Sequence, residues 1–182
     1  MAANIIRLHI GGGADRRSRL LLPEAPAFTR LSALIADLAQ AVGGPPFEAH
    51  VTLLSGITVE GEDLTGRVRA LARVLAPAGV VLTRARQRTE FFKALFLEVE
   101  GGDLHGAHRR AAAAMGMTPP AQYRPHLSLL YGDFAPATKD AILDRIGRRW
   151  DEPCLLDRLA LVSPQGPPSS WVRAPTLTLG AG

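Results

Sequence analysis

Two short segments of the chain place a histidine and a hydroxyl residue two positions apart, with apolar residues between and after them. The first segment is His50-Val51-Thr52-Leu53, and the second is His126-Leu127-Ser128-Leu129. In a β-strand, residues i and i+2 project from the same face. We therefore expect each histidine to lie beside its own hydroxyl residue, while the apolar residues point into the core.

Two histidines and two hydroxyl groups that face one another across a cleft would suit the cleavage of a phosphodiester. The pKa of histidine lies near neutral pH, so one imidazole can accept a proton from water while the other protonates the leaving oxygen. The hydroxyl groups of Thr52 and Ser128 can donate hydrogen bonds to phosphate oxygens. The pattern leaves open which of His50 and His126 is the base and which is the acid.

Other kinds of site fit the residues less well. A single His-x-Thr segment usually indicates a strand with a solvated polar face, but its recurrence in two similar halves favours one shared site. A catalytic cysteine is poorly supported, because Cys154 has no evident partner. His105 and His108 have the spacing of one helix face, yet the neighbouring Arg109 and Arg110 would repel a cation. We interpret this pair as a solvated helix face and expect no metal and no cofactor.

Composition describes an ordinary globular protein with a basic balance. The chain has 182 residues, of which 47% are hydrophobic and 21% charged, and its formal net charge is +4. Lys93 and Lys139 are its only lysines. Arginine binds phosphate oxygens through two parallel hydrogen bonds, which suits a phosphate-bearing partner. An arginine-rich composition follows equally well from a GC-rich genome, so the charge alone does not show whether the partner carries phosphate.

Several features bear on where the protein works. No run of 18 uncharged apolar residues is present, so we expect no membrane span. The first ten residues lack the features of a secretory signal. A single cysteine excludes an internal disulfide. We therefore expect a cytoplasmic protein.

Apolar periodicity predicts an alternation of helices and strands. We expect helices over residues 27–42, 64–76, 103–115 and 136–149, and strands at 19–22, 80–86, 91–99, 155–162, 171–179 and both histidine segments. This order predicts a two-lobed, pseudo-symmetric α+β fold, in which two antiparallel sheets face each other across a central cleft with helices on the outside. Residues 1–15 would form an N-terminal extension, and residues 16–182 a single bilobal domain.

The doubled segment resembles the paired His-x-Thr/Ser signature of the 2H phosphoesterase superfamily. It is most similar to the cyclic phosphodiesterase branch known from plants and yeast, which is related to 2′-5′ RNA ligase-like proteins. The resemblance covers about residues 18–179. Its supporting segments are Pro46-Phe47-Glu48, Phe91-Phe92, Tyr123-Arg124-Pro125, and Leu159-Ala160-Leu161-Val162 with Trp171. Plant members carry an aromatic residue on the first strand, where this chain has Leu20.

This resemblance implies metal-independent hydrolysis of a 2′,3′-cyclic nucleotide or of ADP-ribose 1″,2″-cyclic phosphate. His50 and His126 would be the acid–base pair, and Thr52 and Ser128 would hold the phosphate. The partner would be a small-molecule cyclic phosphate, with RNA ends possible, and no membrane or obligate protein partner is inferred.

Two aromatic residues are also implicated by the resemblance. Tyr131 would be a further contact on the phosphate side, and Phe92 would line a nucleoside pocket. Because Tyr131 lies three positions after Ser128, it can reach the site only if the strand ends or bends before Gly132. For Phe92, packing in the core is the competing interpretation.

Two alternatives remain open. One is an RNA 2′-5′ ligase or RNA-end cyclic phosphodiesterase that acts on oligonucleotides; Arg84, Arg86 and Arg88 alternate on one predicted strand and would line a basic groove. The other is a non-catalytic module that binds a nucleotide or RNA.

Overall fold

The computed structural model describes residues 17–57, 61–119, 122–163, 168 and 171–180, so the expected extension at residues 1–15 lies outside it. Strands and helices alternate along the chain, as the periodicity predicts. In chain order the elements are β1 (Arg17–Pro23), α1 (Ala25–Val42), β2 (Val51–Ile57), α2 (Gly61–Val74), β3 (Ala78–Gln87), the short 3₁₀ helix η1 (Phe91–Lys93), β4 (Leu95–Gly101), α3 (Leu104–Ala114), β5 (His126–Leu130), α4 (Pro136–Ile146), β6 (Arg149–Ser163), β7 (Val172–Arg173) and β8 (Leu177–Thr178).

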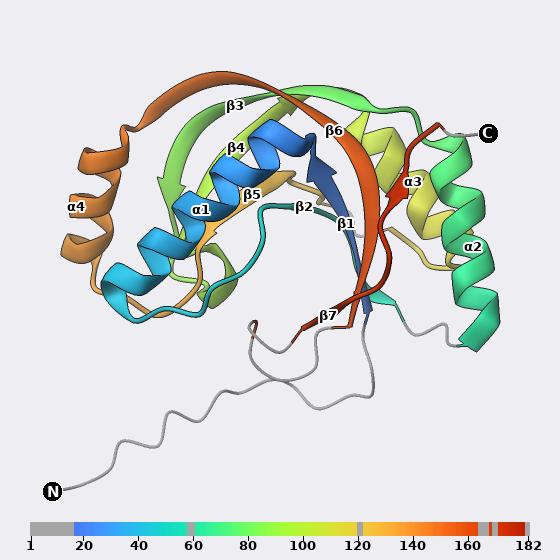
Figure 1. Cartoon of the computed structure of the whole chain (residues 1–182), viewed down its shortest axis with the longest axis horizontal. Helices are drawn as coiled ribbons and strands as arrows, with labels where there is room; N and C mark the ends of the chain where they lie inside the picture. The colour runs from blue at the N-terminus through green and yellow to red at the C-terminus, as the bar shows by residue number, and fades with distance from the viewer. Residues whose placement is uncertain (1–16, 58–60, 120–121, 164–167, 169–170, 181–182) are drawn as a thin grey trace, which may run out of the picture.

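The strands form two antiparallel halves that are joined at both sides. One half runs β2-β1-β6 and the other β5-β4-β3-β6, so the two share the long strand β6. The first part of β6 pairs with β3 and its later part with β1, and Figure 1 shows this strand arching over the molecule. A contact between β2 and β5 closes the arrangement. The expected two-lobed α+β fold is therefore confirmed.

Helices cover the outside of the strands. In Figure 1, α2 and α3 lie together at one side, and α1 and α4 lie towards the other. Helix α1 buries Leu31, Ile35 and Leu38, which recur at helical spacing. It has a proline in its first turn and ends at Gly43, whose φ of 72° is the left-handed conformation that glycine adopts readily.

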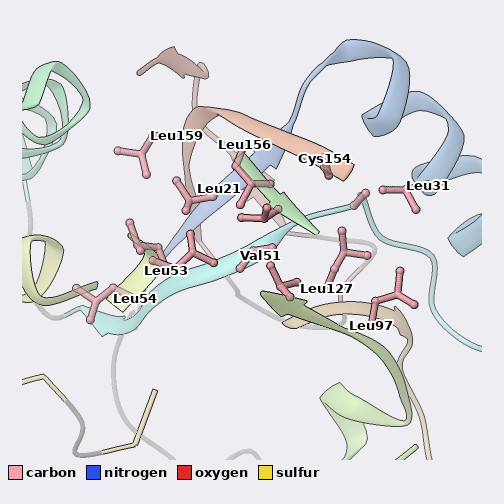
Figure 2. Packing of buried hydrophobic residues seen from close by; sticks show 14 of the residues in the cluster. Leu21, Leu31, Val51, Leu53, Leu54, Leu97, Leu127, Cys154, Leu156 and Leu159 are labelled. Carbon is pink, nitrogen blue, oxygen red and sulfur yellow. The ribbon is translucent and has the colours of Figure 1, made fainter. Parts of the chain in front are cut away.

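The apolar members of both histidine segments lie in the main core. Val51, Leu53, Leu127 and Leu129 are fully buried there, and Figure 2 shows Val51 and Leu127 among the packed side chains. Because alternate residues of a strand point to opposite faces, burial of these positions turns the histidines and hydroxyl residues to the other side. Packing of the core thus sets the direction of the polar residues.

Several predicted element boundaries are wrong. The strand expected at residues 155–162 begins earlier, at Arg149, and the strand expected at 171–179 is divided into β7 and β8. Residues 91–93 form the turn η1 and not the start of a strand, because the Lys93 amide donates to the Glu90 carbonyl at 2.9 Å. The fourth helix ends at Ile146, before Gly147 with its φ of 83°, and β6 already begins at Arg149. A glycine in this conformation ends the helix and lets the chain turn into the strand.

None of the helices in the described part of the chain is long and apolar enough to cross a membrane.

The core contains one arginine that sequence patterning did not indicate. Arg19 of β1 has 0% of its surface exposed. Its Nη2 contacts the Met115 sulfur at 3.6 Å, while Nε and Nη1 have no hydrogen-bond partner among the described residues. Burial, with a smaller effect from the charge of Arg17, lowers the pKa of Arg19 to about 10, so the group remains charged at neutral pH.

We expect Arg19→Met to raise the free energy of unfolding by about 1–3 kcal/mol, because a buried, incompletely paired charge costs more than an apolar side chain of similar length. Urea denaturation would measure this change. Arg69→Met on the exposed surface of α2 is the matched control and should change stability by less than about 0.5 kcal/mol. A clear loss of stability in Arg19→Met would contradict the prediction.

Candidate active site

The pairing of β2 with β5 brings the two histidine segments together. Val51 lies opposite Leu127 in an antiparallel register. Continuing this register by one residue in each direction places His50 opposite Ser128, and Thr52 opposite His126. Each histidine therefore has the hydroxyl residue of the other segment across from it, as well as its own beside it. By this register the four polar residues share one face, where β5 and the start of β2 join the halves of the molecule.

Both histidines are oriented by the same local hydrogen bond. His50 Nδ1 lies 2.6 Å from the Glu48 carbonyl oxygen, and His126 Nδ1 lies 2.9 Å from the Arg124 carbonyl oxygen. A carbonyl only accepts, so each Nδ1 carries the proton and donates it to the residue two positions earlier. Each Nε2 is then unprotonated in the neutral ring and is a hydrogen-bond acceptor. The pseudo-symmetry thus extends to the individual atoms.

The surroundings keep both imidazoles neutral. Burial is the main cause that lowers the pKa of His50 to about 4; its bond to Glu48 opposes the shift, and the nearby charge of His126 adds to it. Burial also lowers the pKa of His126, which Lys93 lowers further, while the Arg124 carbonyl and Glu90 raise it. At neutral pH the neutral form of both rings, which is the form a general base requires, is therefore favoured.

Tyr131 reaches the site because β5 ends at Leu130, one residue before it. Its hydroxyl lies 3.3 Å from His50 Nε2, and its ring stacks on Phe47 with centroids 3.7 Å apart. Burial raises the pKa of Tyr131, so the hydroxyl keeps its proton and can donate it to His50. The geometric condition set by the sequence is met, since the strand stops before Gly132.

The hydroxyl residues differ in their present contacts. Ser128 is buried, and its Oγ donates to the Phe92 carbonyl at 2.9 Å. The side chain of Thr52 is half-buried and has no hydrogen bond among the described residues. Thr52 is thus free to donate to a bound group, whereas Ser128 must first leave the Phe92 carbonyl.

Phe92 lies at the rim of the site and not in the core. Its side chain is 46% exposed, and its ring meets those of Tyr131 and Trp171 at 5.2 and 6.0 Å. The turn η1 carries it there, and this turn is tied to the end of β5 by the bond from the Gly132 amide to the Phe91 carbonyl. The interpretation of Phe92 as core packing is therefore wrong.

A recess opens beside each histidine, and the two differ in chemistry. The His50 recess, of about 390 Å³, is lined mainly by apolar and aromatic side chains: Leu20, Leu22, Phe47, Val162 and Trp171. The His126 recess, of about 380 Å³, is lined mainly by charged ones: Arg88, Glu90, Lys93, Glu98 and Arg124. A pseudo-symmetric pair of histidines thus sits between two unlike surfaces.

Two side chains on the α3 side form hydrogen bonds to the backbone of β2. Sequence patterning did not identify either role. Tyr123 donates its hydroxyl proton to the Thr52 carbonyl at 3.1 Å, and His108 donates from Nδ1 to the Leu53 carbonyl at 2.7 Å. Their rings stack with centroids 4.1 Å apart and an interplanar angle of 1°. The two side chains thereby bind the backbone of the strand that carries Thr52.

The interpretation of His105 and His108 as a solvated helix face is wrong for His108. His105 is exposed, but His108 is 5% exposed, on the side of α3 that packs against β2. The repulsive arginines, Arg109 and Arg110, lie on the exposed side of the helix. Alanines dominate the buried face of α3, so its apolar pattern gives no strong signal for which histidine turns inward.

The three arginines expected to line one basic groove, Arg84, Arg86 and Arg88, do not lie together. Arg86 is paired with Glu98 at 3.2 Å, and Arg84 lies with Arg86 in a separate hollow near α4. Arg88 comes just after the end of β3 and lines the His126 recess. Only Arg88 of the three therefore lies in the same recess as a site histidine.

Comparison with known proteins gives a family and a set of similar folds. A family model described as the 2′-5′ RNA ligase superfamily matches residues 23–168. The structure of TT0787 of Thermus thermophilus is similar at a TM-score of 0.58 and 19% identity, covering 91% of this chain and 98% of that one. No curated protein gives a significant match.

Two structures of LigT of E. coli share the fold as well. The complex with NADP+ has a TM-score of 0.56 and 17% identity, covering 91% of this chain and 97% of that one. The complex with 3′-AMP has a TM-score of 0.60 and 13% identity, covering 91% and 98%. At these identities the likeness establishes the α+β fold.

We expect the His50 imidazole to titrate near pH 4 in the folded protein, which NMR of the ring nitrogens would measure. Because this pKa lies below the unfolded value of about 6.5, the unfolded state binds more protons as the pH falls between these values. Stability should therefore decrease as the pH falls from about 6.5 to about 4. In His50→Gln this dependence should become shallower. A His50 titration near the unfolded value would contradict the prediction.

Tyr123→Phe removes the donor to the Thr52 carbonyl but keeps the ring that stacks on His108. We expect the free energy of unfolding to fall by about 1 kcal/mol, the usual net value of such a bond, and exchange of the β2 amides to become faster. Chemical denaturation and hydrogen exchange would measure the two effects. Unchanged exchange along β2 would show that this bond does not hold the strand.

Proposed function

Because the chain belongs to the 2′-5′ RNA ligase superfamily, we propose that it is a metal-independent cyclic phosphodiesterase. Membership of this family supports a phosphoesterase-type activity. The proposed substrate is a 2′,3′-cyclic nucleotide or ADP-ribose 1″,2″-cyclic phosphate, opened by two-histidine acid–base catalysis. The observation that carries the proposal is the pairing of Val51 with Leu127. Continued by one residue on each side, this register brings two imidazoles with unprotonated Nε2 atoms to one face with two hydroxyl residues.

In the proposed reaction, the phosphate lies between His50 and His126. One Nε2 accepts a proton from water as the water oxygen bonds to phosphorus, and the other imidazole protonates the leaving ribose oxygen as its bond to phosphorus breaks. Each transfer contributes about 10²–10⁴-fold to the rate. Thr52 donates to a phosphate oxygen, and Ser128 does so after its hydroxyl turns from the Phe92 carbonyl.

The lowered pKa values of His50 and His126 suit the role of general base more directly than the role of general acid. A neutral imidazole is ready to accept a proton, but the acid must first be protonated. A bound phosphate would promote this protonation, since an anion in contact with an imidazole raises the pKa of the imidazole. Tyr131, which donates to His50 Nε2, would yield this position to the substrate and remain a phosphate-side contact.

The nucleoside would occupy the His50 recess. Phe47 and Trp171 offer aromatic surfaces there, and Phe92 extends them at the rim. Stacking of a base on such side chains is worth about 1–3 kcal/mol. The LigT structures complexed with NADP+ and 3′-AMP are consistent with a nucleotide ligand for this fold. A cytoplasmic location, which we expect from the sequence features given above, is part of the proposal.

One observation favours a second candidate, an RNA-end cyclic phosphodiesterase or 2′-5′ ligase. The cations of the His126 recess would suit a longer, phosphate-rich substrate. A module that only binds nucleotide is less well supported, because binding alone does not require two matched imidazoles. Binding of a cyclic nucleotide without product after long incubation would favour such a module.

We expect His50→Ala and His126→Ala each to lower kcat by about 10²–10⁴-fold, because each removes one proton transfer. Hydrolysis of a nucleoside 2′,3′-cyclic phosphate in EDTA, with the product isomer identified, is the assay. Circular dichroism would verify that both variants are folded. His105→Ala, which removes an exposed histidine of α3, is the matched control and should retain activity.

The same assay can overturn the proposal. Wild-type turnover by either site variant would exclude acid–base catalysis by that histidine. Loss of activity in EDTA, restored by a divalent cation, would exclude a metal-independent reaction. Turnover of RNA ends without turnover of mononucleotides would replace the first candidate with the second.

A further inference from the structure

The His126 recess carries more positive charge than its carboxylates neutralise. Glu98 is already paired with Arg86 at 3.2 Å. Three cationic side chains, those of Arg88, Lys93 and Arg124, line the recess, and none has an ion pair or side-chain hydrogen bond within the described part of the chain. Glu90 is the one remaining carboxylate there. The recess therefore has three cations against one unpaired anion.

The backbone of Arg88 is held on both sides by hydrogen bonds. The Arg88 amide donates to the Ala94 carbonyl at 3.3 Å, and the Arg88 carbonyl accepts from Lys139 Nζ at 2.7 Å. Lys139 itself is 5% exposed, so it adds a buried positive charge behind Arg88. The charge of Lys93 acts on His126 directly and contributes to lowering its pKa. The cationic side chains are thus presented next to the proposed reaction centre.

The His50 recess offers no comparable excess of charge. Its carboxylate, Glu48, is paired with its cation, Arg173, at 3.1 Å. The other main lining groups are apolar or aromatic. An anionic part of a substrate would therefore be attracted to the His126 side, and an apolar base to the His50 side.

We propose that the His126 recess is a subsite for a second phosphate of the substrate, held by Arg88, Arg124 and Lys93. This inference rests on the proposed function, because the scissile phosphate is taken to lie between the histidines. A cyclic mononucleotide without a 5′-phosphate carries no group for the subsite. The preferred substrate is then a cyclic phosphate joined to at least one further phosphate, such as a 5′-phosphorylated nucleotide or the end of an oligonucleotide. Guanidinium groups suit this role, since they bind phosphate oxygens bidentately.

The test compares two substrates that differ only in the second phosphate. They are adenosine 2′,3′-cyclic phosphate and its 5′-phosphorylated form. At low salt we expect the wild-type protein to favour the 5′-phosphorylated form by about tenfold or more in kcat/KM, the value of one good charge-assisted contact. Raising the salt concentration should reduce this preference, because ions screen the exposed charges.

Variants then locate the effect. In Arg88→Ala/Arg124→Ala the ratio of the two kcat/KM values should fall towards one. The matched control is Arg69→Ala/Arg145→Ala, which removes the same net charge from exposed positions of α2 and α4 and should keep the wild-type ratio. Lys93 is left in place because its charge acts on His126, and replacing it would change both the subsite and the proton transfer.

The outcomes separate the two proposals. Equal hydrolysis of both substrates by the wild-type protein, or a preference that survives in Arg88→Ala/Arg124→Ala, would overturn the subsite and leave the proposed function intact. If neither substrate is hydrolysed, the proposed function fails. The subsite is then judged by the ratio of Kd values for the two nucleotides in calorimetry, and equal Kd values would overturn it as well.

Discussion

The arrangement of the candidate site depends on the pairing of Val51 with Leu127. This pair joins β2 to β5, and the polar residues on either side of it make up the site. Both members are fully buried, so the main core holds the two strands in one register. A shift by one residue would turn every histidine and hydroxyl residue into the core. The chemistry of the site is therefore tied to the packing beneath it.

The short extent of this pairing explains the contacts around it. β2 and β5 share a single register pair, so β2 needs other partners on the side of β5. Tyr123 and His108 supply them by donating to successive backbone carbonyls, and their stacked rings fix each other's position. Strand β6 closes the molecule on the opposite side by pairing with both β1 and β3. The two halves are thus held together on both sides of the site.

The site is symmetric in its backbone and asymmetric in its surroundings. His50 and His126 make the same bond to a carbonyl two residues earlier. Beyond the rings, however, aromatic and aliphatic side chains surround one recess, and cations line the other. A repeated strand motif positions the proposed acid–base pair, and the loops and helices that differ between the halves would then set which substrate is accepted. A shared pair of strand motifs with variable surroundings is consistent with the general rule that one fold can carry different binding surfaces.

Local patterns in the chain were enough to predict that each histidine shares a strand face with the hydroxyl residue two positions later, because a two-residue period follows from strand geometry alone. That the two segments lie side by side was decided by the pairing of β2 with β5. The order of helices and strands and the condition on Tyr131 could be predicted for the same reason, since both depend on neighbours in the chain. Tertiary contacts were needed to establish which histidine of α3 is buried, that Phe92 lies at the rim, and that one arginine is enclosed in the core. The same is true of the position of Arg88 beside His126 and the pairing of Arg86 with Glu98. These features depend on contacts between segments distant in the chain, which local periodicity does not encode.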